Sequence, residues 1–197
     1  MRLALHACCG PCLLEPFDAL AAEHDVVVVY SNPNIHPFEE YVRRRDTLLA
    51  WADVRSVEVV EVEYDPDAWA EAVADVADDP TRRCRRCFEL RLGMTARVAA
   101  DRGCEAVATT LSVSPYQDHG SIVAAGEAAC SAPGVRFLET DFRERYREAT
   151  RRSCELSMYR QNYCGCVVSR AEAAAQRAER VARKERPRGR EGRAATS

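Results

Sequence analysis

The chain has 197 residues, of which 47% are hydrophobic and 30% are charged, and its formal net charge is -3 at pH 7. This length suffices for one domain that buries its own core, and the composition is that of a soluble globular protein. No apolar run is long enough to cross a bilayer, so the composition argues against an integral membrane protein and we expect no membrane partner.

Strand-like and helix-like segments alternate along the chain. In chain order the hydrophobic periodicity predicts a strand at 2–7, a helix at 13–24, a strand at 26–30, a helix at 38–54, a strand at 57–64, a helix at 68–77, a helix at 84–102, a strand at 105–110, a helix at 119–131, a strand at 135–140 and a helix at 143–157. This alternation predicts an α/β fold with a mostly parallel, Rossmann-like (HUP-like) sheet and helices on both faces. Such a sheet binds ligands beyond the carboxyl ends of its strands.

We expect a single α/β domain at 1–169, followed at 170–197 by an arginine-rich C-terminal helix and a disordered tail. This last segment holds nine basic and four acidic residues. It would add sequence-independent attraction to a nucleic-acid backbone, or it is a solvated tail with no role.

Ten cysteines are a large number for a protein without an evident export signal. In the first residues, MRLALHACCG, the short apolar stretch is interrupted at His6, and the hydrophobic region of a signal peptide is lacking. We therefore expect a cytoplasmic location, where thiols stay reduced. There, many cysteines favour metal ligation or redox catalysis over a disulfide framework.

Three cysteines directly follow the first predicted strand: Cys8, Cys9 and Cys12 in the sequence CCGPC. A phosphate loop would occupy this position in a nucleotide-binding protein, but the segment has one glycine and no lysine. Because neighbouring side chains diverge, we expect Cys8 and Cys9 to reach different corners of a cluster, or two metals, and not to share one zinc. One buried thiol with two uninvolved neighbours is the alternative.

Cys84 and Cys87 form a CxxC pair among four arginines where a helix is expected to begin. The helix dipole and the arginines there should favour thiolates. Joined to Cys8 and Cys9, the pair supplies the four thiolates that a 4Fe-4S cluster takes. A four-cysteine zinc site usually shows two CxxC pairs. The spacing favours the cluster and leaves zinc open.

Cys164 and Cys166 flank Gly165, a spacing too tight for two good ligands to one metal. The glycine would let the backbone bend into a small disulfide ring, strained and readily reduced, as in a redox-active pair. The alternative is that one thiol binds metal and the other is spare.

Other polar residues are weaker candidates. Asp118 would act as acid, base or metal ligand, or would cap the helix that follows it. The candidates for substrate contacts are His36, Tyr116, Arg160, Gln161 and Asn162.

Five stretches together resemble the epoxyqueuosine reductase QueH family. They are LHACCGPC at 5–12, YSNPNIHPFEEYVRR at 30–44, RCRRCFELRL at 83–92, TTLSVSPYQDH at 109–119 and YRQNYCGC at 159–166. The stretches span most of residues 2–168 in order, and the arginine-rich tail lies outside them. The segment before Cys84 is short for the family, and 147–158 departs from its usual sequence.

The resemblance implies a two-electron deoxygenation of epoxyqueuosine in tRNA to queuosine. It also implies a 4Fe-4S cluster held by Cys8, Cys9, Cys84 and Cys87, with an additional mononuclear iron. Cys164 and Cys166 would be the redox-active pair. For the second iron, Cys12 and Asp118 are the candidate ligands, and the electron donor is unknown.

Two other functions are kept as alternatives. A zinc-stabilised tRNA-binding module would contain zinc without sulfide and would be colourless. A nucleotide-dependent tRNA thiolation enzyme would need a phosphate loop, which CCGPC does not resemble.

Overall fold

The computed structural model describes residues 1–185, with side chains through residue 183. Five strands form one sheet in the order β3-β2-β1-β4-β5, and every neighbouring pair is parallel. The strands are β1 (Arg2–His6), β2 (Asp25–Tyr30), β3 (Val59–Glu61), β4 (Ala106–Thr109) and β5 (Arg136–Phe137). The predicted α/β fold is therefore confirmed, and the described sheet is parallel throughout.

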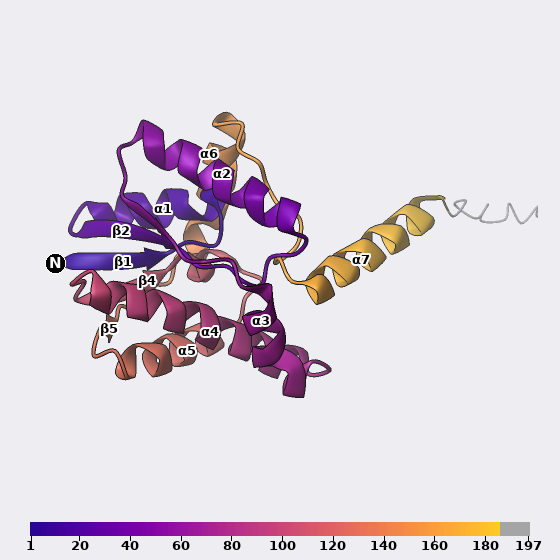
Figure 1. Ribbon diagram of the computed structural model, residues 1–197. Coiled ribbons are helices and arrows are strands. Elements are labelled where there is room, and N and C mark those ends of the chain that lie inside the picture. The colour runs from indigo at the N-terminus through magenta and orange to yellow at the C-terminus, as the bar shows by residue number, and fades with distance from the viewer. Residues whose placement is uncertain (186–197) are drawn as a thin grey trace, which may run out of the picture.

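Helices cover both faces of this sheet. In Figure 1, α1, α2 and α6 lie above it, and α4 and α5 lie below it. The helices are α1 (Gly10–Ala21), α2 (Phe38–Val54), α3 (Pro66–Val73), α4 (Pro80–Asp101), α5 (His119–Ser131), α6 (Tyr146–Glu155) and α7 (Val167–Glu185), with short 3-10 turns at Ala74–Val76, Thr110–Val113 and Arg143–Arg145. Among the helices of residues 1–185, none is long and apolar enough to cross a membrane.

Alternation along the central strand places its side chains in two cores. Leu3 and Leu5 are fully buried in the core that α1 and α2 cover, whereas Ala4 packs in the core against α4. Successive side chains of a strand point to opposite faces, so this pattern is what a strand buried on both faces requires. Each fully buried leucine contributes roughly 1.5–3 kcal/mol to folding.

The topology places a ligand site beside β1. The chain runs from β1 to β2 and β3 on one side, and then crosses over to β4 and β5 on the other. The carboxyl ends of β1 and β4 therefore form a topological switch point, where open parallel sheets bind ligands. His6 and Thr109 are register partners there, so the segments after them start side by side.

The edge strands are shorter than the sequence pattern predicts. β3 covers Val59–Glu61 within the expected 57–64, and β5 covers Arg136–Phe137 within 135–140. Each edge strand has one neighbouring strand only, and its backbone pairing covers two or three residues. The sequence pattern of a strand extends beyond these paired residues.

The C-terminal helix α7 includes residues 170–185 of the segment expected to hold an arginine-rich helix. The disordered tail expected after it falls on residues 186–197, which lie outside the described residues. The division of the chain at 169/170 stays a prediction.

Candidate thiol and substrate site

The three sulfurs of the first cysteine group converge. The Sγ atoms of Cys8, Cys9 and Cys12 all lie within 4.8 Å of one another, and those of Cys8 and Cys9 are 3.9 Å apart. The expectation that the two adjacent side chains diverge is therefore wrong. Cys9 is the last extended residue before α1, and the change from strand to helix turns both sulfurs to the same side. Three sulfurs at this spacing are suited to a soft metal.

Within the triad, Cys8 is the thiol that loses its proton most readily. Hydrogen bonds from the thiols of Cys12 and Cys9 hold the pKa of Cys8 well below its ordinary value, and the positive charge of Arg91 acts in the same direction. The same contacts raise the pKa of Cys12. Thr110 adds a further contact, because its Oγ1 accepts from the Cys8 backbone N–H at 3.1 Å and lies 3.5 Å from its Sγ.

His6, which ends β1 just before the triad, is a neutral, buried ring. Its Nε2 donates to the carbonyl oxygen of Ser31 at 3.2 Å, so Nδ1 accepts from the Thr109 hydroxyl at 2.8 Å. Burial, and then the charge of Arg91, lower the pKa of His6 to about 3. The ring therefore joins β1 to β4 without carrying charge at neutral pH.

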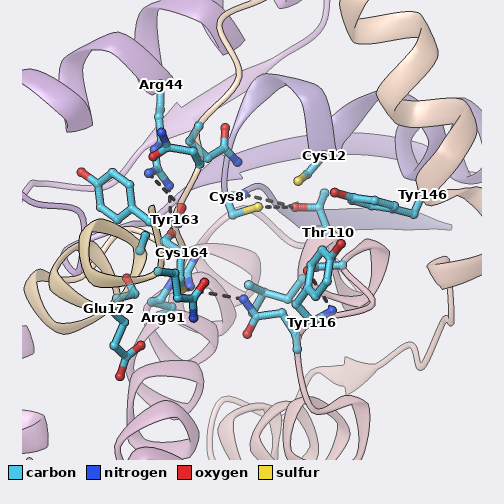
Figure 2. A pocket seen from close by; sticks show the side chains of 18 of the residues that line it. Cys8, Cys12, Arg44, Arg91, Thr110, Tyr116, Tyr146, Tyr163, Cys164 and Glu172 are labelled. Carbon is cyan, nitrogen blue, oxygen red and sulfur yellow. Dashed lines mark hydrogen bonds between the residues drawn. The ribbon is translucent and has the colours of Figure 1, made fainter. Parts of the chain in front are cut away.

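A cavity of about 620 Å³ opens above the switch point. Figure 2 shows Cys8 and Cys12 beside Thr110, with Tyr116 and Tyr146 on the same side of the cavity. The Tyr116 side chain is 84% exposed, and its ring meets that of Tyr146 edge-on at 5.9 Å. The volume is within the range of pockets that hold a nucleoside-sized ligand.

The second and third cysteine groups lie next to each other. Cys166 packs against the buried cluster that contains Cys87, and the charges of Cys164 and Cys166 act on both Cys84 and Cys87. The expectation that Cys84 and Cys87 are favoured as thiolates is wrong for the protein alone, because burial raises the pKa of Cys87 to about 12. The helix α4 begins at Pro80, so the pair lies beyond its first turn.

The loop of Cys164 and Cys166 is held by the segment that follows β2. The Arg44 guanidinium donates to the carbonyl oxygen of Cys164 at 2.9 Å and to that of Tyr163 at 3.2 Å. The backbone N–H of His36 donates to the carbonyl oxygen of Gly165 at 2.9 Å. These contacts fix the loop across more than a hundred residues of sequence.

Gly165 is required at the centre of this loop. Its φ is +141°, a conformation that other residues rarely adopt, and a Cβ there would lie 3.0 Å from both Asn34 Nδ2 and Ile35 Cγ1. The Asn34 side chain is fully buried, and neither of its amide atoms has a hydrogen-bond partner among the described residues.

The two thiols of this loop have different surroundings. Cys164 is exposed and lines the cavity, where Gln117 Nε2 lies 3.7 Å from its Sγ. Cys166 directly precedes α7, and its Sγ accepts from the backbone N–H of Ser169 at 3.4 Å. One thiol thus faces the cavity while its neighbour faces the helix.

Besides Arg83, which precedes Cys84 and is 6% exposed, two arginines buried more completely lie among these cysteines. Arg44 and Arg91 are each 2% exposed. Arg44 pairs with Glu40 at 2.7 Å. Arg91 has no carboxylate partner among the described side chains: its Nη2 donates to Asn32 Oδ1 at 2.6 Å, and its Nε has no partner. A buried cation without an anion is strongly unfavourable, so a negatively charged group bound beside Arg91 would be stabilised.

Neither arginine belongs to a motif that marks it as a site residue in the sequence, although the position of each on its helix carries a signal. Arg44 lies on the same stripe of α2 as the buried Tyr41 and Leu48. Arg91 lies on the buried stripe of α4 beside Phe88. A charged residue on the apolar stripe of a helix indicates a buried charge with a specific partner.

The residues present fit an iron–sulfur cluster or another anionic metal–thiolate group. The donors are soft thiolates. The charge of Arg91 acts on Cys8, Cys87 and Cys164 alike, so it is near enough to both cysteine groups to offset the negative charge of metal-bound thiolates.

Three of the candidate substrate contacts line the 620 Å³ cavity: Tyr116, Gln161 and Asn162. Gln161 also contacts the triad, because its Nε2 donates to Cys9 Sγ at 2.8 Å. Arg160 lines a smaller cavity of about 70 Å³ on the other side of Cys12 and donates to Cys154 Sγ at 3.0 Å.

The remaining substrate candidate, His36, and the candidate iron ligand Asp118 lie elsewhere. His36 is not among the described residues that line either cavity, and its ring packs 5.7 Å from that of Trp69. Asp118 is the N-cap of α5, where its carboxylate accepts from the backbone N–H of Ser121 at 2.9 Å. This geometry matches the capping alternative and gives no support to Asp118 as an iron ligand.

Fold and site together define a Rossmann-like α/β protein with a thiol-lined cavity at the switch point of its sheet. A family model described as epoxyqueuosine reductase QueH matches residues 3–172, and the chain belongs to this family. A protein named epoxyqueuosine reductase QueH from Dehalococcoides mccartyi is 38% identical over 173 residues, covering 87% of this chain and 93% of the relative. One of the same name from Thermotoga maritima is 37% identical over 182 residues, covering 89% and 93%.

Proposed function

We propose that this chain is an epoxyqueuosine reductase, which removes the epoxide oxygen from epoxyqueuosine in tRNA and leaves the cyclopentene of queuosine. Its relatives are named for this reaction. The observation that carries the proposal is the meeting of Cys8, Cys12 and Cys164, from two distant cysteine groups, around one cavity at the switch point. The proposal includes a cytoplasmic location, where these thiols stay reduced.

The reaction balances with one pair of thiols. Converting an epoxide to an alkene breaks two C–O bonds, takes up two electrons and two protons, and releases water. Oxidising two thiols to a disulfide supplies both the electrons and the protons. Cys164, in the cavity, and Cys166, at the start of α7, are the proposed pair. An external electron donor, whose nature is unknown, then reduces the disulfide.

The proposed cofactors are a 4Fe-4S cluster on Cys8, Cys9, Cys84 and Cys87 and an additional mononuclear iron. Cys12, whose Sγ lies within 4.8 Å of those of Cys8 and Cys9, is the proposed ligand of the second iron beside the cluster. The bound metal would supply Lewis acidity toward the epoxide oxygen and electron transfer.

The residues around the cavity would bind the nucleoside and exclude water. The exposed Tyr116 ring offers a surface for base stacking, which typically contributes about 1–3 kcal/mol per base. Gln161 and Asn162 offer amide groups for the base edges. The amide of Gln161 is already engaged with Cys9, so it would link substrate position to the triad.

Three serine variants of the anaerobically purified protein test the cofactor assignment. We expect Cys84→Ser to lose most iron and acid-labile sulfide, because the cluster loses a ligand. We expect Cys12→Ser to keep sulfide and lose about one iron per chain. Cys154→Ser, which changes an exposed cysteine, is the matched control and should keep both.

Two outcomes would contradict this assignment. If Cys84→Ser retains iron and sulfide while Cys12→Ser loses both, the triad holds the cluster and the proposed ligand set fails. If the wild-type protein is colourless and carries zinc without sulfide, the zinc-stabilised tRNA-binding module replaces the reductase.

A further inference from the structure

We propose that one face of α7, formed by Arg170, Arg177 and Arg180 and named here the arginine face, binds the phosphate backbone of tRNA beside the cavity. The inference rests on the proposed function for the identity of the RNA. It adds the surface that would hold the RNA while one nucleoside enters the cavity.

The spacing of the three arginines places them on one side of the helix. Positions i, i+7 and i+10 fall within an arc of about 80°, and the first and last are about 15 Å apart along the axis. Glu179 lies on the opposite side of the helix by the same periodicity. The face therefore presents positive charge over a length that several phosphates of one strand would occupy.

These arginines are exposed and have no carboxylate partner. Among the described side chains, none of the three forms a salt bridge. Some arginines elsewhere on the surface are engaged, as Arg85 is with Glu89 and Arg151 with Glu148. Others, such as Arg82 and Arg97, form no salt bridge among the described side chains, so the arginine face is distinguished by the grouping of three such residues on one side of α7. Because the whole chain has a net charge of -3, a polyanion must be attracted by a local surface of this kind.

The arginine face borders the cavity. Arg180 lines it together with Ser169, Glu172, Ala173 and Gln176 of the same helix. The carboxylate of Glu172 is paired with Arg83 at 3.6 Å, so its charge is already offset. The positive charge of Arg170 acts on the hydroxyl of Tyr163, which lines the cavity as well. In Figure 1, α7 projects from the body of the protein, which leaves its sides accessible to a large partner.

The composition of α7 favours RNA over a membrane surface as the anionic partner. A helix that lies in a membrane interface buries large apolar residues such as Trp, Phe and Leu. The apolar residues of α7 are alanines and valines. The exposed aromatic ring of Tyr116 across the cavity is the complement of an RNA base and not of a lipid headgroup.

The test compares two triple variants of the full-length, anaerobically purified protein. The first is Arg170→Gln, Arg177→Gln and Arg180→Gln. The second, matched in charge, is Arg97→Gln, Arg102→Gln and Arg136→Gln, which changes exposed arginines near the amino ends of the strands. The binding of tRNA with and without epoxyqueuosine is measured as a function of salt.

We expect the arginine-face variant to bind both tRNAs at least tenfold more weakly at low salt. The slope of log K against log salt should fall by about 2, since each lost phosphate contact removes roughly 0.7–0.9. The control variant should keep most of the slope. Equal slopes in the wild type and the arginine-face variant would overturn the inference. Loss of binding to anionic phospholipid vesicles, with tRNA binding unchanged, would assign the face to a membrane and overturn it too.

These results separate the inference from the proposed function. If the slope falls as expected and epoxyqueuosine in the tRNA gives no gain in affinity and is never deoxygenated, the arginine face stands and the reductase proposal fails. If the modified tRNA is deoxygenated and the slope is unchanged, the reductase stands and the arginine face fails.

Discussion

Arg44 donates a hydrogen bond to the carbonyl oxygen of Cys164 at 2.9 Å, across 120 residues of sequence. This contact ties the loop of the proposed redox pair to α2, and α2 packs on the same core as β1. The position of Cys164 in the cavity therefore depends on a buried cation and its partner Glu40.

We expect Arg44→Gln to lower the free energy of unfolding by about 3–5 kcal/mol, because it leaves Glu40 buried without its cation. Removing both charges in the double variant Glu40→Gln with Arg44→Met should recover part of this loss. Urea unfolding of the metal-free proteins measures both. The control is Arg45→Gln, a partly exposed neighbour paired with Asp46, which should cost less than about 1 kcal/mol. An equal loss of unfolding free energy in Arg44→Gln and Arg45→Gln would show that Arg44 does not hold the cysteine loop in place.

Gly165→Ala should lower both stability and turnover. The substitution strains a φ of +141° and pushes a methyl group against Asn34 and Ile35, which we expect to cost about 2–3 kcal/mol and to displace the cysteine loop. Gly134→Ala is the control, because it shares a positive φ but has nothing within 4 Å, so its cost should stay near 1 kcal/mol. Thermal unfolding and the rate of deoxygenation check the pair. Unchanged turnover in Gly165→Ala would contradict the account.

Arg91→Met should affect metal retention more than folding. It removes a buried cation that has no carboxylate partner among the described residues, so the metal-free protein should lose no more than about 1 kcal/mol of unfolding free energy. The loaded protein should lose iron faster to a chelator, because the charge of Arg91 offsets that of the thiolates. Arg102→Met is the control: Arg102 follows the carboxyl end of α4 and pairs with Glu58 at 2.9 Å, so stability should fall slightly and iron retention should not. The reverse pattern would refute this role.

Replacing two helical glycines by alanine should change the free energy of unfolding in opposite directions. At Gly126 a Cβ would lie 2.4 Å from the ring of Phe137, so overpacking should cost about 1–3 kcal/mol. At Gly93 the nearest atom is 4.0 Å away, so alanine should add about 0.5–1 kcal/mol through helix propensity. Denaturant unfolding of Gly126→Ala and Gly93→Ala checks the packing of α5 on β5. Stabilisation by both would contradict it.

Local pattern was enough to predict the elements. The range 38–54 predicted for a helix is that of α2, because the proline before it marks its start and its apolar stripe runs along its length. The ends of β3 were not predictable, since a strand ends where its neighbour stops pairing, and that depends on β2. The helix predicted at 84–102 begins four residues earlier, at Pro80, because Asp79 caps it.

The site was only partly predictable for the same reason. The cysteine groups are visible as short spacings in the sequence. Their arrangement is not, because the proximity of Cys87 to Cys166 and of Arg44 to Cys164 is set by long-range packing. The convergence of Cys8 and Cys9 depends on the backbone turn at a single residue, which spacing alone does not reveal.

A single-turnover experiment tests the central claim most directly. The reconstituted protein, reduced and then freed of reductant under anaerobic conditions, is mixed with tRNA that carries epoxyqueuosine, and both the nucleosides and the cysteines are mapped by mass. The account predicts about one queuosine formed for each disulfide between Cys164 and Cys166, and no queuosine from Cys164→Ser or Cys166→Ser. Deoxygenation at the wild-type level by both serine variants, or no deoxygenation by the wild type, would contradict it.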